Sequence, residues 1–107
     1  MKERESRALV YARAAGRCEM CLVRQPTDYQ HRKNRSQGGG WSPDNGLHLC
    51  HECHMWIHAN PAVAGSGGWY VRSWQEPTAV PVLMRRGITW LTPIGTYSST
   101  APLEVTP

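Results

Sequence analysis

Two closely spaced pairs of cysteines constrain this chain more than any other feature of its sequence. Each pair is a C-x2-C knuckle, and the chain has no further cysteine; the four residues are Cys18, Cys21, Cys50 and Cys53. Two such knuckles can supply the four thiolates of a tetrahedral zinc site. The first residues lack the apolar stretch of a secretory signal, so we expect a reducing cytoplasm, where paired knuckles indicate metal ligands more often than disulfides. The alternative is a set of four buried, free cysteines.

The small size of the chain favours a structural metal. A domain of 107 residues buries only a modest fraction of its surface, so zinc would contribute stability that a small core cannot supply. No apolar run approaches the length of a membrane span. We therefore expect one small domain with zinc as a structural cofactor.

The local patterns predict short helices and strands around the cysteines. The expected order is helix, strand, glycine-rich loop, strand and helix: residues 3–15, 27–31, 32–46, 47–49 and from the second knuckle to about 59. Gly16 is a natural stop for the first helix, and Pro61 ends the second, because a residue before proline disfavours helical geometry. Alternation along the first strand places His31 on one face and Asp28 and Gln30 on the other.

The C-terminal part of the chain is expected to extend the same domain. Residues 65–68 predict a flexible joint, and the strands expected after it cover residues 69–74, 80–84 and 88–91. The last two strands form a hairpin that turns at Arg85-Arg86-Gly87. The expected division is a core, an extension packed on it and a disordered tail: residues 1–64, 65–97 and 98–107.

Positive charge is concentrated in the first third of the chain. Residues 1–35 carry nine Lys or Arg against four acidic residues, whereas the remainder carries three against four. A basic half on a small domain indicates a polyanionic partner, most often nucleic acid. The alternative is a solvated helix face, which is the simpler interpretation for Arg4, Arg7 and Arg13 taken alone.

Several histidines have the spacing of functional groups. His54 and His58 form an H-x3-H pair, which a helix places on one face, where two imidazoles can hold one divalent metal. The alternative is that they are surface or capping histidines. His48 and His51 are weaker candidates.

His31 ends the first predicted strand and is followed by three basic residues, Arg32, Lys33 and Arg35. Neighbouring cations disfavour a protonated imidazole, so His31 should be neutral and able to accept a proton near pH 7. The guanidinium groups suit phosphate oxygens. Asn45, at the far end of the loop, could tie the loop to the strand through side-chain hydrogen bonds.

These residues resemble the motif of the HNH (ββα-metal) endonucleases, in particular small bacteriophage members. The resemblance rests on the order His31, Asn45 and His58, with Asn45 five residues before the second knuckle. The matching stretches are residues 31–39 and 53–58, within a region of about 14–61. Together with the helix expected over residues 3–15, the resemblance implies a small α+β fold: a ββα-metal core with a four-cysteine zinc site, an N-terminal helix and a C-terminal β-hairpin.

The resemblance also implies roles for these residues. His31 would be the general base, Asn45 would brace the loop, and His54 and His58 would hold one catalytic divalent metal (Mg²⁺, Mn²⁺, Ni²⁺ or Zn²⁺). The residues that would contact DNA phosphates are Arg32, Lys33 and Arg35. The four cysteines would hold the structural zinc. The implied activity is metal-dependent hydrolysis of DNA, nicking or weakly specific, by a phage-encoded protein in the host cytoplasm, with the large terminase subunit as a packaging partner.

One position departs from the family pattern. Family members usually carry Asp, Glu or His as a metal ligand immediately before the base, and here that residue is Gln30, a neutral and weaker ligand. Asp28, on the same strand face, is a candidate substitute. Two alternatives therefore stay open. One is a zinc-stabilised DNA-binding module without catalysis, and the other is a zinc-ribbon module that binds a protein partner through its tryptophan-rich C-terminal hairpin.

Overall fold

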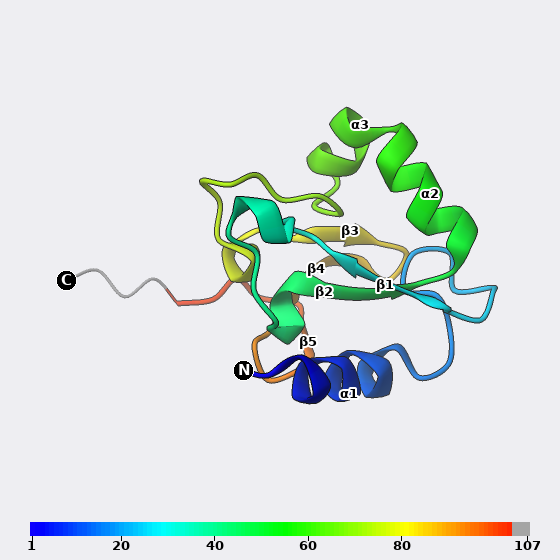
Figure 1. The fold of residues 1–107 in the computed structure, drawn as a ribbon, viewed down its shortest axis with the longest axis horizontal. Coiled ribbons are helices and arrows are strands. Elements are labelled where there is room, and N and C mark those ends of the chain that lie inside the picture. Colours follow the sequence, from blue (N-terminus) through cyan, green and yellow to red (C-terminus); the bar gives the residue numbers. More distant parts are fainter. Residues whose placement is uncertain (104–107) are drawn as a thin grey trace.

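The computed structural model describes residues 1–103, and an antiparallel hairpin with helices on either side lies at its centre (Figure 1). Strand β1 (Asp28–His31) pairs with strand β2 (Gly46–Leu49), so that Asp28 lies opposite Leu49 and His31 opposite Gly46. Helix α2 (His51–Ala59) begins two residues after β2 ends. The predicted order of strand, loop, strand and helix is confirmed.

Helix α1 (Glu3–Ala14) covers one side of the hairpin. Its acidic first turn and basic last turn complement the helix dipole, and its buried residues Ser6, Val10 and Ala14 follow one another at the four-residue spacing of a helix face. The Ser6 hydroxyl lies 3.2 Å from the Tyr29 hydroxyl of β1. The helix ends one residue earlier than predicted, because Ala15 already adopts the left-handed conformation (φ 54°).

A third helix was not predicted. Helix α3 (Pro61–Ser66) follows α2 after a single residue, so the flexible joint predicted over 65–68 is wrong in its first half. Pro61 does end α2, but its fixed φ also suits the first position of a new helix, where its missing N–H costs nothing. The α2–α3 pair rises from the side of the hairpin away from α1 (Figure 1).

The strand predicted over 69–74 is absent from residues 1–103. Trp69 and Val71 have the alternating apolar pattern of a strand and are both buried, yet their backbone pairs with no other strand among residues 1–103. The Val71 N–H instead donates to the Arg32 carbonyl at 2.8 Å. The Trp69 N–H donates to the Ala64 carbonyl of α3, and the Tyr70 hydroxyl donates to the Gln37 side chain, so a few separate hydrogen bonds and buried side chains hold this segment.

A second sheet closes the fold, with strand order β3-β4-β5: Val82–Met84, Gly87–Leu91 and Tyr97–Ser98. The hairpin between β3 and β4 turns at Arg85 and Arg86, as predicted. Strand β5 was not predicted, and Ser98 pairs with Trp90 of β4 rather than starting a tail. The last part of the predicted tail, 104–107, lies outside the described residues.

One apolar core joins both sheets. Its fully buried members come from β2, α2, α3, β3 and β4: Leu47, Leu49, Ile57, Ala64, Val82 and Leu91. Three of the four cysteines, Cys18, Cys50 and Cys53, belong to the same cluster. Residues 1–103 thus form a small α+β fold with three α-helices and two small antiparallel sheets, and within them no helix is both long and apolar enough to span a membrane.

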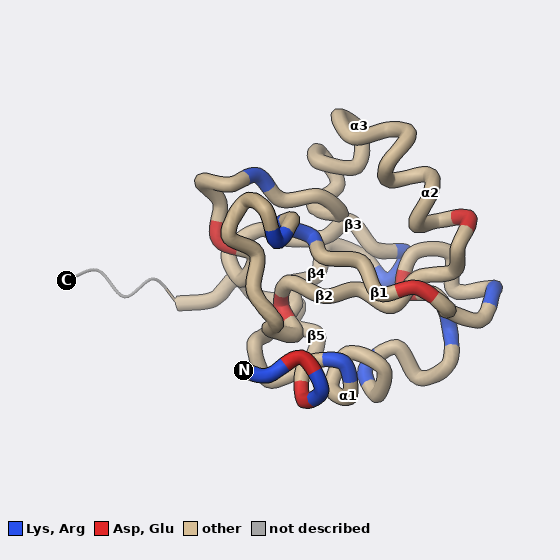
Figure 2. The backbone as a smooth tube through the Cα atoms, in the orientation of Figure 1, with Lys and Arg blue, Asp and Glu red and all other residues tan. Residues whose placement is uncertain are grey.

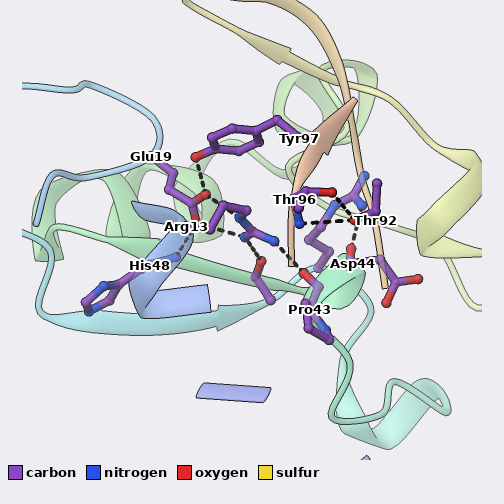
Figure 3. Close-up of polar contacts among 10 residues, drawn as sticks. Arg13, Glu19, Pro43, Asp44, His48, Thr92, Thr96 and Tyr97 are labelled. Carbon is purple, nitrogen blue, oxygen red and sulfur yellow. Dashed lines mark hydrogen bonds and ion pairs between the residues drawn. The ribbon is translucent and has the colours of Figure 1, made fainter. Parts of the chain in front are cut away.

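A buried ion pair connects α1 to the first cysteine knuckle (Figure 3). Two guanidinium nitrogens of Arg13 donate to the two carboxylate oxygens of Glu19 at 2.8 and 2.9 Å, and the two side chains are 1% and 0% exposed. Glu19 also accepts from the His48 N–H of β2 and from the Tyr97 hydroxyl of β5. The solvated helix face expected for Arg13 is therefore wrong, since the residue is part of the interior.

Candidate functional site

The four cysteines meet at one place between the first knuckle and the start of α2. Their four sulfur atoms all lie within 4.8 Å of one another. Sulfur ligands of a tetrahedral zinc ion at about 2.3 Å are separated by about 3.8 Å, so this cluster is compatible with a structural zinc site. Cys50 is the N-cap of α2, and its sulfur accepts from the Cys53 N–H at 3.4 Å, which orients the second knuckle.

Burial disfavours thiolate charge at two of the four cysteines. Burial raises the pKa of the Cys50 and Cys53 thiols, because a buried thiolate without a counter-charge is unfavourable. Burial also acts against the Cys21 thiolate, but hydrogen bonds from the backbone of Arg24 and Val23, together with those of Cys18 and Cys53, outweigh it and bring the pKa of Cys21 to about 6. A dication would compensate the thiolate charge that this burial penalises.

A second group of ligand-type side chains lies between β1 and α2. The Nε2 atoms of His54 and His58 are 3.1 Å apart, so their lone pairs can converge on one ion. The opposite ring nitrogen of His54, Nδ1, lies 2.8 Å from a carboxylate oxygen of Asp28. A carboxylate in this position fixes the tautomer and the orientation of a metal-binding imidazole. Because Asp28 and His54 are 26 residues apart, the fold brings them together.

Two other candidates take different positions. His51 also contacts Asp28: its Nδ1 lies 2.9 Å from the same carboxylate oxygen that His54 contacts, but its side chain is 64% exposed. Gln30 is 3% exposed, and its amide nitrogen donates to the His31 carbonyl at 2.9 Å. This bond engages the amide nitrogen of Gln30 and not the oxygen that could bind a metal.

His31 sits in an aromatic and cationic surrounding on the α1 side of the hairpin. Its ring lies 5.1 Å from the Tyr29 ring and 4.4 Å from the Trp41 ring, both edge to face. Partial burial lowers the pKa of His31, and the Arg35 and Arg7 guanidinium groups lower it further. Its Nε2 is buried and has no hydrogen-bond partner among residues 1–103. A neutral imidazole at pH 7 follows, as expected from basic neighbours, although one of these neighbours comes from α1.

The loop after β1 is held by Asn45, which is 2% exposed. Its side-chain oxygen accepts from the Lys33 N–H at 2.7 Å, and its amide donates to the Lys33 and Gly40 carbonyls at 3.1 and 3.2 Å. Gly39 has to be glycine here, because a Cβ would overlap the Lys33 carbonyl. Asn45 therefore occupies the bracing position that the resemblance implies.

Arg32 does not lie where a phosphate contact would require it. Its side chain is fully buried, and its guanidinium donates to four backbone carbonyls at 2.7–2.9 Å, those of Asp44, Gly68, Pro77 and Val80. Burial lowers the pKa of Arg32 to about 10, so the group stays charged at neutral pH. Lys33 is 8% exposed, and only Arg35 of the three expected phosphate ligands is exposed. The expected role of Arg32 is corrected accordingly: it ties the loop to the C-terminal extension.

The hairpin separates the two groups of candidate residues. Adjacent residues of a strand point to opposite faces, and Asp28 faces α2 whereas Tyr29 and His31 face α1. The structure therefore brings together Asp28, His54 and His58, and it brings together His31, Trp41 and the arginines of the α1 side. Sequence reasoning missed Arg7 and Trp41, because neither has a local signal and both are far from His31 along the chain.

Comparisons of this chain with family models, curated proteins and solved structures find no match.

Proposed function

We propose that this chain is a metal-dependent DNA endonuclease of the HNH type, built on a structural zinc held by its four cysteines. The observation that carries the proposal is the pair of Nε2 atoms of His54 and His58, 3.1 Å apart and backed by the Asp28 carboxylate. His31 and Asn45 occupy the remaining positions of the motif. A phage origin and a terminase partner stay predictions from the resemblance.

The donor set at the hairpin–helix junction suits a divalent ion of intermediate softness. Two imidazoles favour Mn²⁺, Ni²⁺ or Zn²⁺ by ligand type, and Mg²⁺ by abundance in cells. His58 is exposed, which leaves room for water and for a phosphate oxygen beside the pair. A divalent ion bound there would polarise the phosphoryl group and stabilise the leaving oxygen.

His31 is the proposed general base. Its neutral imidazole can take the proton of an attacking water, since the neighbouring guanidinium groups of Arg7 and Arg35 disfavour protonation before the reaction. Asn45 keeps the loop after His31 in place through three hydrogen bonds to the backbone. The cysteine cluster anchors the start of α2 and with it His54.

Removal of His31 is the test of the proposal. We expect His31→Ala to reduce the rate of nicking of supercoiled plasmid by about 10²–10⁴-fold, the usual contribution of a general base. The zinc-loaded protein is assayed with Mg²⁺, Mn²⁺ and Ni²⁺. Glu52→Gln, which changes an exposed residue of α2 paired with Arg24, serves as the control and should keep a rate close to that of the wild type. The proposal fails if no metal gives nicking above the His31→Ala background.

Loss of the Asp28 carboxylate should weaken metal binding without disturbing the cysteines. We expect Asp28→Asn to reduce the affinity for Mn²⁺ or Ni²⁺ by about 10–100-fold, because the orientation and basicity of His54 depend on this carboxylate. Isothermal titration calorimetry of the zinc-loaded protein measures this metal affinity. Glu52→Gln, an exposed acidic residue on the same helix, is the charge-matched control. Equal affinities of the two variants would contradict the role of Asp28.

A zinc-stabilised DNA-binding module without catalysis is the second candidate, and a specific arrangement favours it. Gln30 is buried and bonded to its own strand, and the hairpin lies between His31 and the His54–His58 pair. A module of this kind should bind DNA with strong salt dependence, and none of the added metals should support nicking. The plasmid assay and a binding titration together separate the two candidates.

A further inference from the structure

The side of the hairpin that carries His31 also carries two arginines arranged around one tryptophan. The Arg7 guanidinium carbon lies 5.0 Å and the Arg35 guanidinium carbon 5.3 Å from the centroid of the Trp41 ring. The Arg7 guanidinium also lies over the Tyr29 ring at 4.9 Å. We call this cluster of Arg7, Arg35 and Trp41, next to His31, the Trp41 patch. It joins α1 to the loop after β1, both of which carry Lys and Arg on the backbone trace (Figure 2).

The two guanidinium groups of the patch have hydrogen-bonding capacity left for a ligand. Arg7 uses Nε for Glu3 at 2.9 Å and one Nη1 proton for the Tyr11 hydroxyl at 3.0 Å, and within residues 1–103 its other donors make no hydrogen bond. Arg35 is exposed, and its side chain makes neither a hydrogen bond nor an ion pair in the same part of the chain. Arg32, by contrast, donates to four carbonyls of the protein. The donors suited to phosphate are therefore those of Arg7 and Arg35.

The charges of the patch also favour an anion. Both guanidinium groups lie about 5 Å from one ring centroid, so they are at most about 10 Å apart, and salt screens their repulsion only in part. Glu3 neutralises Arg7 only in part, since both side chains of this pair are exposed, at 52% and 36%. A phosphate would relieve the repulsion and would replace the Glu3 carboxylate on the same nitrogen, because guanidinium groups bind both kinds of oxyanion.

We infer that the Trp41 patch is the docking site for backbone phosphates of DNA, with Arg7 of the N-terminal helix and Arg35 as its ligands. Trp41 is the ring that both guanidinium groups approach, next to His31. The N-terminal helix, which lies outside the region that resembles HNH proteins, thereby becomes part of the substrate site. The inference rests on the proposed DNA substrate and names which face of the protein the strand contacts.

The chain offers a matched pair of exposed ion pairs for the test. In the first pair, Glu3 binds Arg7 of the patch. In the second pair, Glu52 and Arg24, with side chains 61% and 56% exposed, lie beside the cysteine cluster. The affinity of zinc-loaded full-length protein for a short fluorescein-labelled DNA duplex is measured by fluorescence anisotropy over a series of NaCl concentrations. No other divalent metal is added, so that binding is separated from cleavage.

The four single variants fall into two pairs with different expected effects on DNA binding. Arg7→Gln should weaken binding about tenfold and reduce the salt slope by about one phosphate contact, and Glu3→Gln should tighten binding. Arg24→Gln and Glu52→Gln carry the same charge changes and should leave the slope at its wild-type value. Equal effects of the two pairs would show that only net charge matters and would overturn the inference, as would a duplex that does not bind at low salt.

The nicking assay distinguishes this inference from the proposed function. If Arg7→Gln changes binding as expected but no metal supports nicking, the docking site stands and the endonuclease proposal fails. If nicking depends on His31 while Arg7→Gln and Glu3→Gln leave the binding slope unchanged, the endonuclease proposal stands and the docking site is wrong. Circular dichroism melting of each variant confirms that the fold is retained.

Discussion

Zinc removal is expected to unfold the whole domain rather than loosen one loop. Structural zinc contributes about 10–16 kcal/mol of apparent binding free energy in small zinc domains. A domain of this size has a total stability of about 5–15 kcal/mol, so the loss of zinc is comparable to everything that holds the fold together. Three cysteines belong to the apolar core that both sheets share, so the loss should spread beyond the knuckles.

The measurement combines metal content with melting. Elemental analysis should find one zinc per chain, and a strong chelator or Cys53→Ser should abolish the cooperative thermal transition in circular dichroism. Re-addition of Zn²⁺ to the chelated wild type should restore that transition. Val23→Ser, which changes an 81% exposed residue two positions after the first knuckle, is the control and should melt like the wild type. A full transition in metal-free protein would refute a structural role for the cluster.

The fold around the cysteines was predictable because its signals are local. Alternation placed Asp28 and His31 on opposite faces of a strand, and the H-x3-H spacing placed His54 and His58 on one helix face. The four-cysteine cluster followed from the knuckles, since zinc chemistry requires four converging donors. Each of these inferences depends on residues a few positions apart.

The features that the sequence did not predict depend on contacts between residues far apart in the chain. Trp69 and Val71 have the apolar pattern of a strand, but no neighbouring strand pairs with their backbone, so the two residues are buried without forming a strand. Arg32 looks like a surface residue in a basic run, yet it binds carbonyls up to 48 residues away. The position of His31 relative to α2 was equally hidden, because it depends on which side of the hairpin each helix covers.

The buried Arg13–Glu19 pair is the other place where one substitution should have a large effect. Glu19→Gln would leave the Arg13 charge buried without a counter-ion, and breaking a buried pair in this way costs about 3–5 kcal/mol. The carboxylate also serves the His48 N–H and the Tyr97 hydroxyl, so three elements lose a common acceptor. Urea unfolding of the zinc-loaded protein at neutral pH measures the change.

Glu3→Gln is the control for this substitution, because it removes the same charge from an exposed pair. It should change the stability by no more than about 1 kcal/mol. Tyr97→Phe, alone and combined with Glu19→Gln, then shows how much of the lost free energy of unfolding depends on the hydrogen bond from β5. If the pair joins α1, the first knuckle and β5 as one unit, the two losses will be less than additive, since each substitution removes the same hydrogen bond. Additive losses would mean that Glu19 stabilises α1 and β2 independently of the C-terminal sheet.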